Sequence, residues 1–98
     1  MAVVQSDRNW ARYRDEIWAG VKIANAPFLE RLRQRFDFSF DPDELARPFT
    51  KPTLMLLGRQ DTSTGYRDAW PILEQYPRAT FAVLDKAGHN LQIEQADL

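Results

Sequence analysis

The sequence predicts an α/β fold in which two parallel strands are joined by a helical crossover. The first observation is a pair of apolar runs, residues 53–58 and 79–84, each of which leads into a glycine-containing turn. A continuous apolar run bounded by turn signals is typical of a strand buried on both faces. The second observation is the intervening segment, in which Trp70, Leu73 and Tyr76 recur at helical spacing. Strand, helix and strand in this order place the carboxyl ends of both strands at the same edge of one sheet.

Polar residues follow each strand at this edge, where open α/β sheets bind their ligands. Asp61 ends the turn after the first strand, and His89, the sole histidine of the chain, ends the turn after the second. A neutral imidazole can accept a proton at one nitrogen while a carboxylate holds the N–H of the other. Asp61 is therefore the predicted partner of His89. Asp85 is the alternative, but it lies at the strand end itself and is expected to cap the turn.

These two turns resemble the acid and histidine turns of the α/β hydrolases. In that family the catalytic acid lies in a G-x-x-D turn after a late strand, which Gly58-Arg59-Gln60-Asp61 matches. The catalytic histidine lies in a Gly-His step after the last strand, which Gly88-His89 matches, with Glu94 on the following helix. The resemblance implies a C-terminal fragment of an α/β-hydrolase fold that hydrolyses an ester or related acyl bond by a Ser-His-Asp mechanism. It further implies that Asp61 and His89 are catalytic, that the substrate is a small acyl compound, and that no cofactor is used.

The nucleophile of that family is missing from the sequence. It lies in the motif G-x-S-x-G, whereas the residues two positions after the four glycines are Lys22, Gln60, Arg67 and Asn90. Ser63 lacks this context and is expected in a solvated turn. Since the family's order is nucleophile, acid, histidine, the nucleophile is expected upstream and the chain is expected to be inactive alone. The alternative function is a non-catalytic binding or assembly module that reuses the hydrolase architecture.

The first half of the chain predicts helices. One is expected from Asp7 to about Ala24 and a second from Pro27 to about Phe36, because apolar side chains recur on one face of each. Residues 36–40 alternate like a short half-buried strand, and residues 41–42 predict the start of a single helical turn.

The two halves are expected to form different parts of the resembled fold. α/β hydrolases insert a helical lid before their late strands, so residues 1–50 resemble a lid remnant and residues 51–98 the C-terminal β-α-β-α part of the core. Within the crossover, Pro71 would interrupt a helix that began at Tyr66. The regular crossover helix is therefore expected to begin near Trp70.

Composition excludes several classes of function. The chain has 13 basic and 14 acidic side chains, a net charge of −1 and no cysteine. It lacks the clustered basic charge of nucleic-acid binders, and it cannot form disulfides or thiolate zinc sites. A metal site built from His89, Asp61, Asp85 and Glu94 is unfavourable, because catalytic zinc sites commonly use several histidines. No apolar stretch reaches the length of a membrane span, so a soluble cytoplasmic protein without membrane contact is expected.

Two parallel strands do not form a free-standing sheet, because their outer edges leave backbone groups unpaired. A second copy of the chain could supply the missing neighbour by edge pairing or by exchange of the N-terminal helices. A homo-oligomer is therefore expected, with Trp10, Ile17, Phe28 and Leu32 buried between chains.

Overall fold

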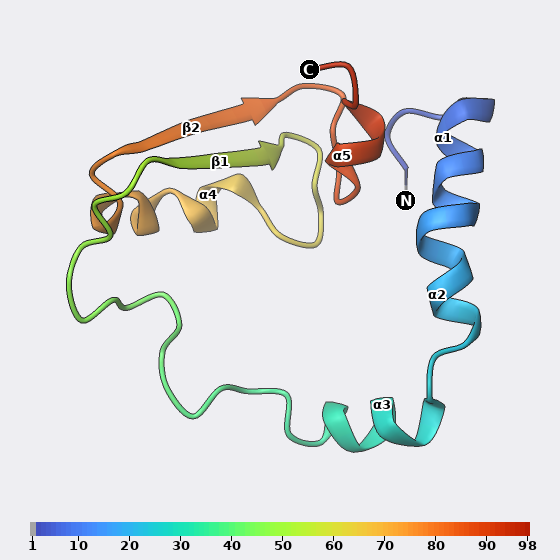
Figure 1. The fold of residues 1–98 in the computed structure, drawn as a ribbon, viewed down its shortest axis with the longest axis horizontal. Coiled ribbons are helices and arrows are strands. Elements are labelled where there is room, and N and C mark those ends of the chain that lie inside the picture. The colour runs from blue at the N-terminus through green and yellow to red at the C-terminus, as the bar shows by residue number, and fades with distance from the viewer. Residues whose placement is uncertain (1) are drawn as a thin grey trace.

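The computed structural model describes residues 2–98 and has an α/β architecture, with helices followed by a parallel β-α-β unit (Figure 1). The predicted fold class is confirmed. In chain order the elements are α1 (Asp7–Arg12), the π-helical η1 (Tyr13–Trp18), α2 (Ala19–Lys22), α3 (Ala26–Arg33), β1 (Thr53–Gly58), α4 (Tyr66–Ala69), the 3-10 helix η2 (Pro71–Gln75), β2 (Ala79–Leu84) and α5 (Leu91–Glu94).

The sheet consists of β1 and β2, which pair in parallel from Thr53 opposite Ala79 to Gly58 opposite Leu84. Both strands begin and end where the sequence predicts. The crossover packs against one face, where the rings of Trp70 and Phe81 meet edge to face with centroids 5.2 Å apart.

The opposite face of the sheet corrects the expectation of burial on both sides. Leu54 and Leu56 of β1 are 62% and 44% exposed. Their side chains have no cover because, within residues 2–98, the crossover packs against one face of the sheet and no further layer lies on the other.

The predicted helices of the first half are present but shorter than expected. The stretch from α1 to α2 is continuous and begins where Ser6 Oγ accepts a hydrogen bond from the Asn9 amide at 3.1 Å. It ends at Lys22 rather than near Ala24. The next helix begins at Ala26, capped by Asn25, and ends at Arg33 rather than near Phe36. None of the described helices combines the length and apolar character required to cross a membrane.

Between α3 and β1 the predictions were wrong. Residues 36–40 form an irregular segment with bends rather than a strand, because an alternating segment without a neighbouring strand has no partner for its backbone hydrogen bonds. The predicted helical turn after them is a non-helical turn, in which Asp41 Oδ1 accepts a hydrogen bond from the Asp43 amide at 2.9 Å.

The crossover also differs from the prediction. Its helix α4 begins at Tyr66, four residues before the expected start at Trp70, and changes into the 3-10 helix η2 at Pro71. Proline has no N–H to donate to the carbonyl four residues earlier, so the α-helical hydrogen bonds stop there.

The turns after the two strands are in direct backbone contact. A Cβ atom added to Gly58 would lie 2.5 Å from the carbonyl oxygen of Ala87 and 2.6 Å from that of Gly88. Beside this contact, the Arg59 amide donates to the carbonyl of Leu84 and the Gln60 amide to that of Ala87, each at 2.9 Å. Only glycine leaves room for the second turn to rest on the end of β1.

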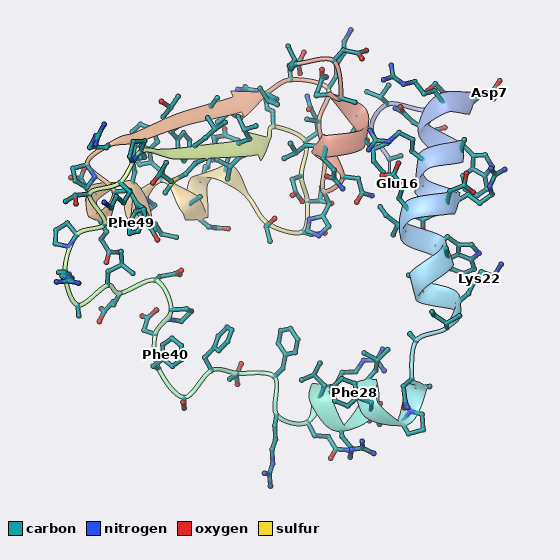
Figure 2. All side chains as sticks on the ribbon, viewed as in Figure 1. Asp7, Glu16, Lys22, Phe28, Phe40 and Phe49 are labelled. Carbon is teal, nitrogen blue, oxygen red and sulfur yellow. The ribbon has the colours of Figure 1, made fainter. Side chains whose placement is uncertain are left out.

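The chain as a whole is open. Its radius of gyration is 16.3 Å, whereas a compact domain of this length has about 12.6 Å. Its accessible surface is 8268 Å², against about 5,800 Å² for a compact protein of the same mass. The elements form an arc, and Phe28 and Phe40, 51% and 66% exposed, lie on segments that border its open middle (Figure 2). Among residues 2–98 the buried apolar side chains are those of Ala87 and Ile93.

The contact at Gly58 predicts the effect of adding one methyl group. Gly58→Ala is expected to lower the free energy of unfolding by about 1–3 kcal/mol, because the backbone of the second turn must move. Urea denaturation measures the change. The control is Gly20→Ala in α2, where a Cβ would meet nothing within 4 Å and helix propensity predicts a gain of about 0.5–1 kcal/mol. Equal effects of the two substitutions would contradict this account of Gly58.

Candidate active site

Asp61 and His89 lie side by side at the carboxyl edge of the sheet. His89 Nδ1 is 3.1 Å from Asp61 Oδ2, within the roughly 2.6–3.2 Å expected of such a pair. The contact predicted from the sequence is confirmed. The Asp61 side chain is 7% exposed and that of His89 is 60% exposed. The carboxylate is thus enclosed, while much of the imidazole remains open to solvent.

The Asp61 carboxylate is held largely by its own turn. Oδ1 accepts hydrogen bonds from the amides of Ser63 at 2.8 Å and Thr64 at 3.1 Å, and Oδ2 accepts one from the Thr64 hydroxyl at 2.9 Å. Aspartate commonly accepts hydrogen bonds in this way from amides a few residues further along a turn. The expected solvated turn at Ser63 thus has a further role, because it supplies donors to the Asp61 carboxylate. The available signal was an aspartate followed closely by Ser63 and Thr64.

These contacts decide the protonation state of Asp61. Burial by itself raises the pKa of the carboxyl group, but the amides of Thr64 and Ser63, the His89 ring and the Thr64 hydroxyl together outweigh burial and lower the pKa well below its ordinary 3.8. An ionised carboxylate can only accept hydrogen bonds. The proton between the two groups therefore lies on His89 Nδ1, and in the neutral ring Nε2 keeps its lone pair.

The alternative partner, Asp85, is engaged elsewhere. Its Oδ1 accepts a hydrogen bond from Gln60 Nε2 at 2.7 Å. Hydrogen bonds from Gln60 and then from the Lys86 amide lower the pKa of Asp85. The geometry thus pairs His89 with Asp61 and not with Asp85.

Two further side chains support the turn that carries His89. Gln60 Oε1 accepts a hydrogen bond from the Ala87 amide at 3.1 Å, and Glu94 Oε2 accepts one from the Gly88 amide at 2.5 Å. Neither role was predicted from the sequence, since a glutamine or glutamate side chain that accepts a hydrogen bond from a backbone amide leaves no sequence pattern. Within residues 2–98 no three His, Cys, Asp or Glu side chains are grouped so that they could hold a metal ion.

Neither a protein-family model nor a curated protein matches the sequence. Among solved structures, the chain matches the crystal structure of an alpha/beta superfamily hydrolase from Oenococcus oeni PSU-1, with a TM-score of 0.86 and 23% sequence identity over 99% of the chain. The chain has part of an α/β-hydrolase fold. It spans 36% of the length of that hydrolase. The match is consistent with the C-terminal segment that the sequence predicts.

The hydroxyl of Thr64 gives a test of how the carboxylate is held. Thr64→Val removes one donor to Asp61 and is expected to raise the Asp61 pKa, because fewer hydrogen bonds then favour the charged form. A titration of the carboxyl carbon by NMR measures this pKa. In the control, Thr62→Val, the lost hydroxyl makes no hydrogen bond to Asp61, so the pKa should stay at the wild-type value. Coincident titration curves for all three proteins would refute the assigned contact.

Proposed function

We propose that this chain supplies the acid and the base of a hydrolase that cleaves an ester or related acyl bond by a Ser-His-Asp mechanism. The observation that carries the proposal is the 3.1 Å contact between His89 Nδ1 and Asp61 Oδ2. In this mechanism the carboxylate holds Nδ1–H and stabilises the imidazolium. Nε2 takes the proton of the attacking hydroxyl and returns it to the leaving group.

The environments of the two side chains suit these roles. Asp61 is enclosed and its pKa is lowered, so it keeps its negative charge when the ring beside it becomes positive. His89 is 60% exposed, which leaves its ring accessible to a reacting group. The substrate of the proposed reaction is a small acyl compound, and no step requires a cofactor.

The nucleophile and the oxyanion hole are proposed to come from polypeptide outside these 98 residues, since the motif G-x-S-x-G does not occur in them. The uncovered Leu54 and Leu56 of β1 support this, because a larger sheet with another layer would cover them. The surface area supports it too. It exceeds the value for a compact protein of 11.4 kDa by roughly 2,500 Å². In the same proposal, residues 1–50 are the end of a lid and residues 51–98 belong to the core.

An assay with activated short-chain esters tests the proposal. The chain alone should hydrolyse them no faster than the same concentration of free imidazole, because an imidazole–carboxylate pair without a positioned hydroxyl and oxyanion hole cannot complete acyl transfer. Turnover that disappears in His89→Ala would place a nucleophile within the chain, with Ser63 the first residue to replace.

Sequencing the DNA upstream of the Met1 codon gives a second test, because an in-frame G-x-S-x-G is expected there. Its absence would favour a non-catalytic binding module.

We also propose that the isolated chain forms a homo-oligomer. Trp10, Phe28 and Leu32 are 60%, 51% and 39% exposed, and a two-stranded sheet has two free edges. Association of copies would remove the apolar side chains and the free sheet edges from water. Ile17, half-buried within one chain, would join the same interface.

Sedimentation equilibrium at micromolar concentration is expected to show a dimer or larger species. In the variant Trp10→Ser with Phe28→Ser the association should weaken, because two apolar side chains of the proposed interface are lost. The control, Ile23→Ser, changes an apolar side chain that is 85% exposed and is not part of the proposed interface. A wild-type chain that sediments as a monomer and unfolds cooperatively would overturn the proposal.

A further inference from the structure

A side chain outside the Asp61–His89 pair connects the histidine turn to the beginning of the chain. Glu94 lies in α5 and uses both carboxylate oxygens as acceptors. Oε2 accepts a hydrogen bond from the Gly88 amide at 2.5 Å. Oε1 accepts one from the Val4 amide at 3.1 Å and another from the Val3 amide. One carboxylate thus binds backbone from both ends of the chain.

The contact with Gly88 bears directly on His89, which is the next residue. Both Ala87 and Gly88 are buried, and a buried amide that finds no acceptor is costly. The acceptors of these two consecutive amides are side-chain oxygens, that of Gln60 for Ala87 and that of Glu94 for Gly88. Two side chains from different elements therefore fix the peptide planes that lead into His89.

The other links between the two ends of the chain stop short of the histidine turn. Arg8 forms a two-pronged pair with Asp97, at 3.0 and 3.1 Å, and Arg12 Nη1 donates to the carbonyl of Gln92 at 3.0 Å. The Arg8–Asp97 pair is 61% and 83% exposed, and pairs in such positions contribute little to stability. Glu94, in contrast, contacts both the N-terminal segment and the backbone beside His89.

We infer that Glu94 is a positioning residue for His89. By holding the Gly88 amide it sets the direction of the backbone from which the imidazole extends, so that Nδ1–H points at Asp61. By holding the amides of Val3 and Val4 it couples this arrangement to the docking of the N-terminal segment. The inference rests on the proposed function, in which His89 is the base.

The test reads the His89 ring itself. Because His89 is the sole histidine, a ¹⁵N-labelled sample gives one pair of ring nitrogen shifts, which are detected through the carbon-bound ring protons. They are measured at about pH 9, where an imidazole is ordinarily neutral. In the wild type the two shifts should be well separated, because Asp61 keeps the proton on Nδ1. In Asp61→Ala this hold is lost, and the separation measured there is the reference for a free ring.

In Glu94→Ala the separation is expected to move at least half of the way from the wild-type value to that of Asp61→Ala. The matched control is Asp97→Ala, which breaks a contact between the same two ends of the chain and should keep the wild-type separation. A folded Glu94→Ala with the wild-type separation, or an equal change in Asp97→Ala, would overturn the inference.

Two further comparisons keep the outcomes distinct. If Asp61→Ala leaves the separation unchanged, the Asp61–His89 pair and the proposed function fail. If Asp61→Ala changes the separation of the ring nitrogen shifts but Glu94→Ala does not, the inference about Glu94 fails and the proposed function stands. Should Glu94→Ala not fold, Glu94→Gln decides, because its amide offers one oxygen where the carboxylate offers two. A separation of the two ring nitrogen shifts in Glu94→Gln that lies between the wild-type value and that of Asp61→Ala would support the inference. An unchanged separation would overturn it.

Discussion

The structure depends on the close approach of two backbone turns at Gly58. The carbonyl groups of Ala87 and Gly88 lie where a side chain at Gly58 would begin. Strand pairing holds the ends of β1 and β2 together, and this contact lets the turn after β2 rest directly on the end of β1. Because Asp61 and His89 lie at the ends of these same turns, the approach of one backbone to the other also brings the carboxylate to the imidazole.

The two members of the pair are held in place in different ways. Asp61 is fixed by residues immediately after it, since Ser63 and Thr64 supply amides and a hydroxyl to its carboxylate. The turn that carries His89 is held by side chains outside it, those of Gln60 in the neighbouring turn and of Glu94 in α5. The acid is therefore organised by local sequence, whereas the position of the base requires that the strands, α5 and the N-terminal segment have come together.

This difference explains how much of the molecule could be predicted. The strands and the Asp61–His89 contact follow from local patterns, namely two apolar runs of similar length that end in glycine-containing turns. The alternation of residues 36–40 led to a wrong prediction, because a strand needs a partner and no strand of residues 2–98 pairs with them. The start of α4 at Tyr66 was missed because a switch to 3-10 geometry lets a helix continue past Pro71. The contacts of Glu94 with Val3 and Val4 could not be predicted, because they join residues that only the folded chain brings together.

β1 has an uncovered face and a free edge, and together they bear on aggregation. An uncharged apolar segment of about six residues on an open strand edge is the pattern from which stacked cross-β assemblies grow. Residues 53–58 fit it, but Lys51 and Pro52 precede them and Arg59 follows. Charge and proline beside such a segment oppose indefinite stacking. The flanking residues thus favour closed association, whether with a second copy or with the rest of a hydrolase sheet, over growth into fibres.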